Sequence, residues 1–470
     1  MKDHETLSRL PATELRDRIA RREVSPVEVA EAALAQIERH NGTINAVCTL
    51  SERALDDARA LEKRLAAGEA PGLLCGLPVG IKDVTPVAGV RTTYGSPLYR
   101  DNVPTEDALV VQRLRVAGAI IIGKTNTPEF ATGGNTFNEV FGRTRNPWNP
   151  ALSAGGSTGG GAAALACGMI ALAEGTDLGG SLRIPASFCG VVGLRPSPGL
   201  VPTYPADYAW DTMSVTGPIA RTAGDIALML QAVAGPSPLS PVAQPTAGRD
   251  FVAAVRDGNL RGRKLAYCPD IAGIGIDPEI EARCRQAAFE LKQAGAEVEA
   301  IELDLSFARE PFLAVRGYWM VAAHYHHLER KDHFGSNLKG NVEAGLKLGL
   351  DKLGAAEQAR GRLWQIFYDF FQKYDHLLTP CMAVPPFPVE QNYPATIAGK
   401  AMKTYIDWVA PTFTLSLTGL PVGSVPCGLS GGMPVGMQIV GRPQGEEAVL
   451  LLARQVQEMQ EVGLPDLTKL

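Results

Sequence analysis

The chain has 470 residues, of which 45% are hydrophobic, with 45 basic and 50 acidic side chains and a net charge of −5. This length allows one large domain or two to three smaller ones, and the slight acidic excess offers nothing that a nucleic acid or an acidic membrane would bind. The composition therefore excludes both as expected partners and favours a small molecule.

The first 67 residues predict a helical N-terminal layer, because apolar and charged residues alternate there at helical spacing. In SPVEVAEAALAQIERH, Ser25 and Pro26 are expected to begin a helix whose end Gly42 follows. The N-terminus lacks the apolar core of a secretory signal, so we expect a cytoplasmic protein. The eight cysteines are scattered without a C-x-x-C pair, which indicates neither zinc binding nor redox chemistry.

Residues 68–235 alternate short apolar runs with helical ones, which predicts a mixed α/β core. Within them, GAIIIGKT at 118–125 matches the phosphate-binding pattern G-x-x-x-x-G-K-[ST]. A phosphate cradle needs tight Gly-rich turns, whereas three consecutive isoleucines favour a buried strand. We interpret the stretch as a strand, with Lys124 in the loop before a helix capped by Thr127.

The remaining segments continue the same α/β pattern. The apolar run at 161–173 is too short to span a bilayer and predicts a buried helix. Further on, RKLAYCPD, PEIEARCRQAAFELKQAG and EVEAIEL predict a strand, a helix and a second strand. Residues 307–374 predict a mainly helical lobe beside the site, and residues 375–470 return to the core in short apolar runs.

Two stretches carry polar residues in unusual settings. In LPVGIKDV, Lys82 ends an apolar run, where burial would disfavour its charged form. In AGGSTGGGAAALA, Ser157 and Thr158 lie in a Gly-dense turn before an Ala-rich helix. Each stretch alone also fits an ordinary structure, a lysine snorkelling from a strand end or a turn that packs a helix closely.

A third stretch, GTDLGGSLRIPAS, has the composition of a loop that binds an anion. Gly179 and Gly180 before Ser181 allow backbone N–H groups to point at one place, as in an oxyanion hole beside a nucleophile. Asp177 and Arg183 are expected to pair and hold the loop. A purely structural glycine loop would explain this stretch alone equally well.

Together the three stretches resemble the amidase signature family of serine hydrolases. Its pattern is a lysine in G-x-P-x-x-x-K-D, then G-G-S-S-G-G, then G-T-D-x-G-G-S-x-R-x-P-A-x-x-C-G, and this chain reads GLPVGIKD, GGSTGGG and GTDLGGSLRIPASFCG. Further ordered matches cover most of the chain. The resemblance implies a single domain over 1–470 with a mixed central sheet between layers of helices, and an amidase that uses no cofactor and no metal.

The resemblance also implies a role for each motif residue. Ser181 would be the nucleophile, Ser157 a bridging serine preceded by a cis peptide bond, and Lys82 the neutral base. An acyl-enzyme would form and be hydrolysed to a carboxylate, releasing ammonia or an amine. The oxyanion would lie on the backbone N–H groups of Leu178, Gly179, Gly180 and Ser181.

Three positions depart from the family pattern. Thr158 stands where a second serine is usual, but it keeps the hydroxyl and its expected role in bracing the loop. LSLTGLP at 415–421 lacks the asparagine of N-x-T-G-x-P, which puts a contact from that side chain in doubt. Arg195 replaces a commoner lysine and is expected only to conserve charge.

Histidine is not expected to act in catalysis. The sequence holds none between His40 and His324, so no imidazole is local to the serine-rich motifs, and a Ser and Lys mechanism needs none. His324 and His327 have a spacing that would suit a metal pair, but without a neighbouring carboxylate or cysteine in ligand spacing they favour a solvated or pocket-lining helix.

The sequence leaves the substrate open. The segment ATGGN resembles the family's segment facing the nucleophile, so the expected substrate contacts are Thr132, Gly133 and Gly134. Aromatic residues of a variable region are further candidates, although each also fits the core: Tyr208, Trp210, Trp319 and Trp408.

A free-standing amidase is the leading hypothesis, and a homodimer stays open. The glutaminase subunit of a tRNA-dependent amidotransferase is the nearest alternative, but it usually carries G-Y-Y-D-A-Y-Y where this chain reads LGLDKLGAAEQARGRL. An esterase would use the same acyl chemistry. A non-catalytic binding protein would need none of the three motif side chains, and a nucleotide hydrolase would need a Mg²⁺-binding acid and a true glycine cradle.

Overall fold

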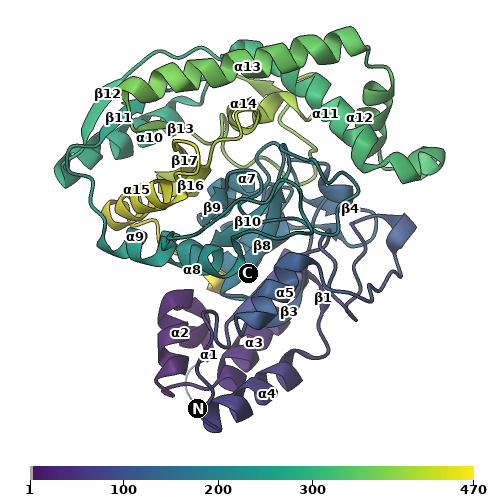
Figure 1. Cartoon of the computed structure of the whole chain (residues 1–470), viewed down its shortest axis with the longest axis vertical. Helices are drawn as coiled ribbons and strands as arrows, with labels where there is room; N and C mark the ends of the chain where they lie inside the picture. Colours follow the sequence, from purple (N-terminus) through teal and green to yellow (C-terminus); the bar gives the residue numbers. More distant parts are fainter. Residues whose placement is uncertain (1–3) are drawn as a thin grey trace.

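The computed structural model describes residues 4–470, and a mixed sheet of eleven strands lies at its centre, surrounded by helices (Figure 1). This confirms the predicted α/β class. In spatial order the strands are β1 (Val47–Leu50), β3 (Ile120–Thr125), β2 (Pro78–Lys82), β8 (Leu172–Asp177), β10 (Val215–Ala220), β9 (Val192–Arg195), β16 (Val422–Ser430), β17 (Met433–Val440), β13 (His376–Pro380), β11 (Lys264–Tyr267) and β12 (Glu297–Ala300).

The direction of the strands brings two of the sequence motifs to one edge of the sheet. β2 lies between β3 and β8 and is parallel to both, with Ile81 opposite Glu174. Because neighbouring parallel strands end at the same edge, Lys82 at the end of β2 and Asp177 at the end of β8 lie near each other. The other half of the sheet mixes antiparallel pairs such as β16 with β17 and the parallel pairs of β11 with β12 and β13.

Four helices and one edge strand make up the N-terminal segment: α1 (His4–Arg9), α2 (Ala12–Ala20), α3 (Pro26–Ile44), β1 and α4 (Ala54–Ala66). The predicted start of α3 is confirmed, since Ser25 and Glu28 cap each other's backbone N–H groups. Its predicted end was wrong. The helix passes through Gly42 and ends at Ile44, and Asn45 caps it with a φ of 55°, the left-handed conformation that Asn tolerates.

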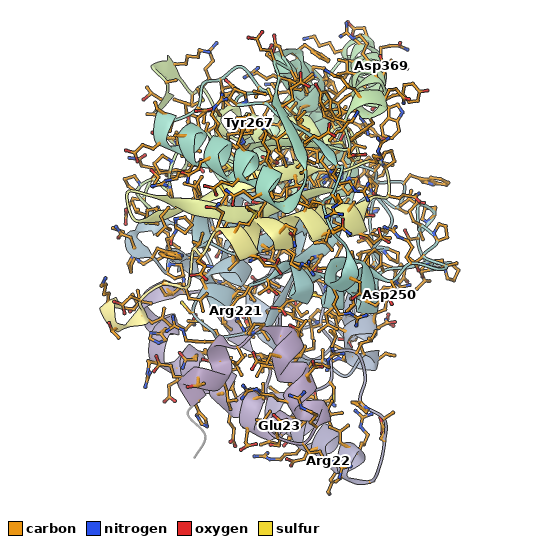
Figure 2. The ribbon with its side chains drawn as sticks, turned by 90° about the vertical axis from the view of Figure 1, so that its left-hand side faces the viewer. Arg22, Glu23, Arg221, Asp250, Tyr267 and Asp369 are labelled. Atoms are coloured by element: carbon orange, nitrogen blue, oxygen red, sulfur yellow. The ribbon has the colours of Figure 1, made fainter. Side chains whose placement is uncertain are left out.

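Arg221 joins this N-terminal segment to the core, and Figure 2 shows it between the two. Its guanidinium donates to the carbonyl oxygen of Leu10 in the first segment and to those of Leu165 (3.2 Å) and Ile170 (2.9 Å) in the core. The side chain is buried, so these carbonyls replace the water that it loses on folding.

The phosphate-like stretch at 118–125 forms β3, but Lys124 lies inside the strand and not in the loop predicted for it. Pairing with β2 continues to Thr125, and only the short 3₁₀ turn η2 (Glu129–Ala131) follows, where we predicted a helix. The buried Lys124 amine donates to the carbonyl oxygen of Thr85 and to Thr92 Oγ1 (3.1 Å). Its hydrogen bonds are internal, which removes the nucleotide-binding interpretation.

The apolar run at 161–173 is not one helix. It spans the end of α6 (Gly159–Ala166) and the start of β8, which pairs with β2 and β10. Periodicity does not distinguish a buried helix from a buried strand in a run that is apolar throughout. The last residues of the run are strand because β8 forms cross-strand hydrogen bonds with β2 and β10.

Residues 307–374 lie in the upper part of Figure 1 and hold α11 (Arg309–Ala323), the 3₁₀ segment η5 (Tyr325–His333), α12 (Ser336–Leu346) and α13 (Leu350–Lys373). The predicted strand, helix and strand before them are confirmed as β11, α10 (Pro278–Glu290) and β12. The remaining α-helices and strands of residues 4–470 are α5 (Leu109–Val116), α7 (Arg183–Cys189), α8 (Ala223–Val233), α9 (Phe251–Asp257), α14 (Ala410–Ser416), α15 (Glu446–Met459) and the short pairs β4 (Phe137–Asn138) with β5 (Gly142–Arg143), β6 (Arg145–Asn146) with β7 (Asn149–Ser153), and β14 (Thr396–Ile397) with β15 (Lys400–Ala401). From residue 4 to 470, no helix has the length and apolar character needed to cross a membrane.

Candidate active site

Lys82 is the last residue of β2, and its side chain is fully buried. The Nζ atom donates to Ser157 Oγ (2.6 Å) and to Thr176 Oγ1 (2.9 Å). Burial lowers the pKa of Lys82 to about 7, although the negative charges of Glu174 and Asp177 act in the opposite direction. A large fraction of this amine is therefore neutral at physiological pH and able to accept a proton.

Ser157 lies in the turn between β7 and α6 and follows a cis peptide bond from Gly156. The next residue, Thr158, connects this turn to the loop of Ser181. Its N–H donates to the carbonyl oxygen of Ser181 (3.2 Å), and its hydroxyl donates to the carbonyl oxygen of Thr176 (3.5 Å). The two serine-bearing loops are thus tied together by the residue for which a bracing role was expected.

Ser181 lies in the loop between β8 and α7, and it lines the same cavity of about 240 Å³ as Ser157. The backbone N–H groups of Leu178, Gly179 and Ser181 have no acceptor within residues 4–470. The N–H of Gly180 donates to Asp177 Oδ1 (2.8 Å). Three unpaired donors therefore surround the Ser181 position, and the fourth is already engaged.

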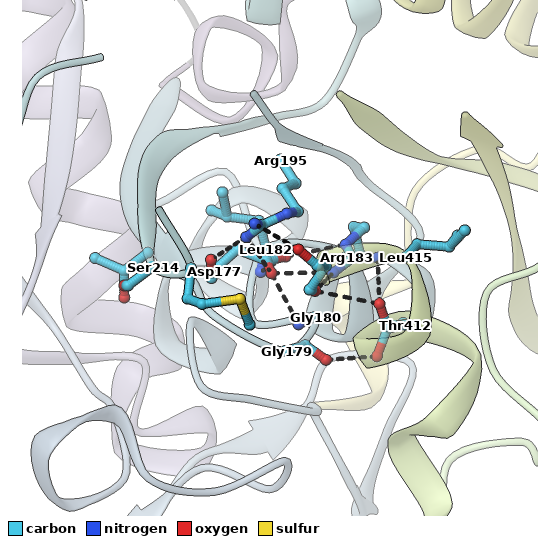
Figure 3. Close-up of polar contacts among 12 residues, drawn as sticks. Asp177, Gly179, Gly180, Leu182, Arg183, Arg195, Ser214, Thr412 and Leu415 are labelled. Carbon is cyan, nitrogen blue, oxygen red and sulfur yellow. Dashed lines mark hydrogen bonds and ion pairs between the residues drawn. The ribbon is translucent and has the colours of Figure 1, made fainter. Parts of the chain in front are cut away.

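Asp177 holds this loop through two buried arginines (Figure 3). Arg183 pairs with both carboxylate oxygens at 3.0 Å, as predicted, and Arg195 lies 3.4 Å from Oδ1. Burial raises the pKa of the Asp177 carboxyl, but the two cations outweigh it and bring that pKa to about 2. Arg195 does more than conserve charge, since it shares the Asp177 carboxylate with Arg183 and donates to the carbonyl oxygen of Ser416 (3.2 Å).

Arg183 also connects the loop that carries Ser181 to α14. Arg183 donates to the carbonyl oxygen of Thr412 (2.9 Å) and to Ser416 Oγ (2.6 Å), and Thr412 Oγ1 donates to the carbonyl oxygen of Gly179 (2.6 Å), a contact drawn in Figure 3. Ser416 occupies the position of the asparagine that LSLTGLP lacks. A polar contact from this position, which the sequence put in doubt, is therefore present with a serine.

Replacing Asp177 by asparagine is expected to lower the free energy of unfolding by about 3–5 kcal/mol, because it leaves two buried guanidinium groups without a carboxylate. Thermal unfolding followed by circular dichroism measures the effect. Asp257→Asn, at an exposed pair with Arg256, is the matched control and should leave the midpoint unchanged. An Asp177→Asn midpoint equal to that of the wild type would contradict a supporting role for Asp177.

The residues that the sequence predicted to contact the substrate line different pockets. Gly133 and Gly134 line a second, smaller hollow of about 40 Å³ that also reaches Ser181. Thr132 lines a separate pocket together with Glu129 and Asn337, and Ser181 does not line it. Of the aromatic candidates, Tyr208 and Trp319 line the main cavity, whereas the other two do not: Trp408 is fully buried and Trp210 is 69% exposed.

The two histidines take different positions. His324 lines the main cavity, and burial lowers its pKa to about 4, so the ring is neutral near pH 7. His327 contacts the hydroxyl of Tyr99. Across the described residues 4–470, no three His, Cys, Asp or Glu side chains gather in an arrangement that could hold a metal ion. The pocket-lining interpretation is confirmed for His324.

Sequence reasoning missed most of the residues that line this cavity, among them Thr176, Asp211 and Arg316. Thr176 is the middle residue of the GTD motif, and its spacing from Asp177 on a strand could have indicated that it faces Lys82. Asp211 and Arg316 lie in segments without a motif. Only the packing of α11 against α12, α13 and α14 brings Arg316 to the site.

The sequence model described as Amidase matches residues 28–450. The chain belongs to the amidase signature family. Among relatives in this family, an acylamidase of Rhodococcus erythropolis is 36% identical over 459 residues, covering 94% of this chain and 94% of that protein. A glutamyl-tRNA(Gln) amidotransferase subunit from Moorella thermoacetica is 35% identical over 475 residues, covering 94% of this chain and 95% of that protein.

Solved structures of amidase signature enzymes have the same fold. A bacterial aryl acylamidase of this family superimposes with a TM-score of 0.90 at 28% identity, covering 96% of each chain. A 6-aminohexanoate cyclic dimer hydrolase gives a TM-score of 0.88 at 27% identity, covering 98% of this chain and 99% of the other. The protein is therefore an amide-hydrolysing enzyme with the amidase signature fold.

Proposed function

We propose that this amidase hydrolyses a small carboxylic amide through Ser181, Ser157 and Lys82. The observation that supports this most is the 2.6 Å contact between the buried Lys82 amine and Ser157 Oγ, in the wall of the cavity that Ser181 also lines. A buried lysine without a carboxylate partner is costly for folding, and its lowered pKa gives it the basicity that a neutral general base needs.

The reaction runs in two steps. Neutral Lys82 takes the proton of Ser157 across their hydrogen bond while Ser157 takes that of Ser181, whose Oγ attacks the amide carbonyl. The tetrahedral intermediate collapses, the C–N bond breaks, and the amine leaves with the proton that returns through Ser157. Water then attacks the acyl-enzyme by the same proton path, which releases the carboxylic acid and restores Ser181.

The oxyanion of each intermediate would be held by the loop before Ser181. The unpaired N–H groups of Leu178, Gly179 and Ser181 are the available donors, and each donor of this kind typically contributes about 3–4 kcal/mol to transition-state stabilisation. The Gly180 N–H would have to be shared with Asp177 and is expected to contribute less.

The pH dependence of activity follows from the base. The pKa of Lys82 is lowered to about 7, and the base acts only when deprotonated, so kcat/KM should rise about tenfold per pH unit below pH 7 and level off above it. Measuring hydrolysis of butyryl p-nitroanilide between pH 5 and 9 tests this. His324 and Asp177 do not titrate in this window, because their pKa values are about 4 and 2. A profile that falls with rising pH would exclude Lys82 as the base.

The first test of the function is turnover of acetamide, benzamide, an anilide and glutamine by the purified chain alone, with the released acid and amine both quantified. A second candidate, the glutaminase component of an amidotransferase, is supported by the relative from Moorella thermoacetica. If glutamine is the one substrate of the panel that is hydrolysed, and its hydrolysis requires a partner protein, the result would favour that candidate. Hydrolysis of simple amides or anilides without a partner would favour the free-standing amidase.

The cytoplasmic location and the oligomeric state stay predictions.

A further inference from the structure

The cavity walls contain a cation that the proposed chemistry does not use. Arg316 lies on α11 and is 8% exposed. It lines both the main cavity and the small hollow, as Ser181 does. Among the described residues that line these two spaces, it is the only lysine or arginine.

The guanidinium of Arg316 is only partly paired. Nε donates to Asn341 Oδ1 (3.0 Å) and Nη2 donates to the hydroxyl of Tyr405 (2.8 Å). Within residues 4–470, Nη1 has no hydrogen-bond acceptor, and no carboxylate forms an ion pair with Arg316. Burying a cation without a counter-charge opposes folding, so its presence beside a nucleophile indicates a ligand that supplies the charge.

The Arg316 side chain is held in a fixed orientation. Its guanidinium carbon lies 5.9 Å from the ring centroids of both Phe312 and Tyr405. Phe312 in turn stacks on Phe413 with 4.2 Å between the rings, and Asn341 donates to the Tyr405 hydroxyl (2.8 Å). A preorganised guanidinium loses little entropy when it binds an anion.

The distribution of acids leaves the Arg316 charge unopposed. Within residues 4–470, no acidic residue lines the small hollow, and two line the main cavity. Asp211 is already occupied, since its carboxylate accepts from Trp319 Nε1 (2.6 Å) and from the N–H groups of Met213 (2.7 Å) and Ser214 (3.0 Å). Asp207 is on an exposed part of its loop.

We propose that Arg316 binds a carboxylate carried by the acyl part of the substrate, so that the preferred substrates are monoamides or monoanilides of short dicarboxylic acids. This inference rests on the proposed function of Ser181. The acyl part stays bonded to Ser181 through both steps, so a contact with a residue that lines both spaces beside Ser181 holds it in acylation and in deacylation. Charge-assisted hydrogen bonds to a guanidinium are the strong form of this contact.

A pair of substrates of nearly equal shape tests the proposal. Succinyl p-nitroanilide carries the carboxylate, and butyryl p-nitroanilide has a methyl group in its place. The wild type should hydrolyse the first with a kcat/KM at least tenfold higher. Arg316→Gln should lower kcat/KM for the succinyl compound about 10- to 100-fold, mainly through KM, and change the butyryl value by less than about threefold. Arg316→Lys should retain part of the preference.

Two controls separate a binding role from a structural one. Tyr405→Phe removes a partner of Arg316 but keeps the charge, so the preference for the succinyl compound should persist. Calorimetric binding of both anilides to Ser181→Ala, with and without Arg316→Gln, needs no turnover and decides the question even if the proposed hydrolysis fails. Equal affinity for the two compounds, or equal losses on both in Arg316→Gln, would overturn the proposal.

Discussion

Ser181→Ala is expected to lower kcat by about 10⁴-fold or more, because the proposed acyl-enzyme forms on this oxygen and no other group can replace it. Substrate affinity and the thermal midpoint should change little, since the loop is held by Asp177 and not by the Ser181 hydroxyl. Steady-state kinetics and labelling by a fluorophosphonate, followed by mass spectrometry, measure the loss.

The matched control is Ser214→Ala, a serine that lines the same cavity. It should retain activity within about threefold of the wild type, because the hydrogen bond from Ser214 to Asp211 is donated by the backbone N–H of Ser214, and alanine keeps that N–H. Activity that persists in Ser181→Ala, or a fluorophosphonate adduct on another serine, would move the nucleophile elsewhere.

Lys82→Met is expected to lower kcat about 10²- to 10⁴-fold and at the same time to stabilise the fold. The pKa of Lys82 is about 7 in the folded protein and about 10.4 in the unfolded chain, so between these values the unfolded chain holds a proton that the folded protein does not. Wild-type stability should therefore rise with pH through this window. At pH 7 the variant avoids a cost of up to about 4 kcal/mol.

Thermal unfolding of the wild type and Lys82→Met at pH 7 and pH 10 tests the second half of this prediction. The variant should have the higher midpoint at pH 7, and the difference should shrink at pH 10. A variant that is less stable at both values would show that the hydrogen bonds to Ser157 and Thr176 outweigh the cost of burying the amine.

Local patterns predicted some elements well and others poorly. The start of α3 was readable because Ser25, Pro26 and Glu28 cap the helix with their own side chains. The end of the same helix was not, since Gly42 is tolerated within it and Asn45 ends it with side-chain hydrogen bonds to Phe141 and Arg143. A start signal is local, whereas this end depends on a distant segment.

The apolar stretches failed for a similar reason. The run at 161–173 and the position of Lys124 were both assigned from side-chain types, which indicate burial but not partners. The residues around Lys124 and the end of the 161–173 run are strands because β3 and β8 pair with β2. Lys124 can be buried within β3 because its amine donates to carbonyl and hydroxyl oxygens of the 85–92 segment. Such pairing is decided between segments far apart in the chain.

The sequence by itself determined the α/β class, the family and the chemical types at the site, because glycine-rich motifs around a lysine and two serines are local and few other structures require them. The tertiary structure decided which of these groups meet. The parallel strands β2 and β8 bring Lys82 to Thr176, the turn before α6 brings Ser157 to the same amine, and burial lowers the pKa of Lys82. Arg316 reaches the cavity from α11, and no motif marks it, since α11 is placed by its packing against α12, α13 and α14, which follow later in the chain.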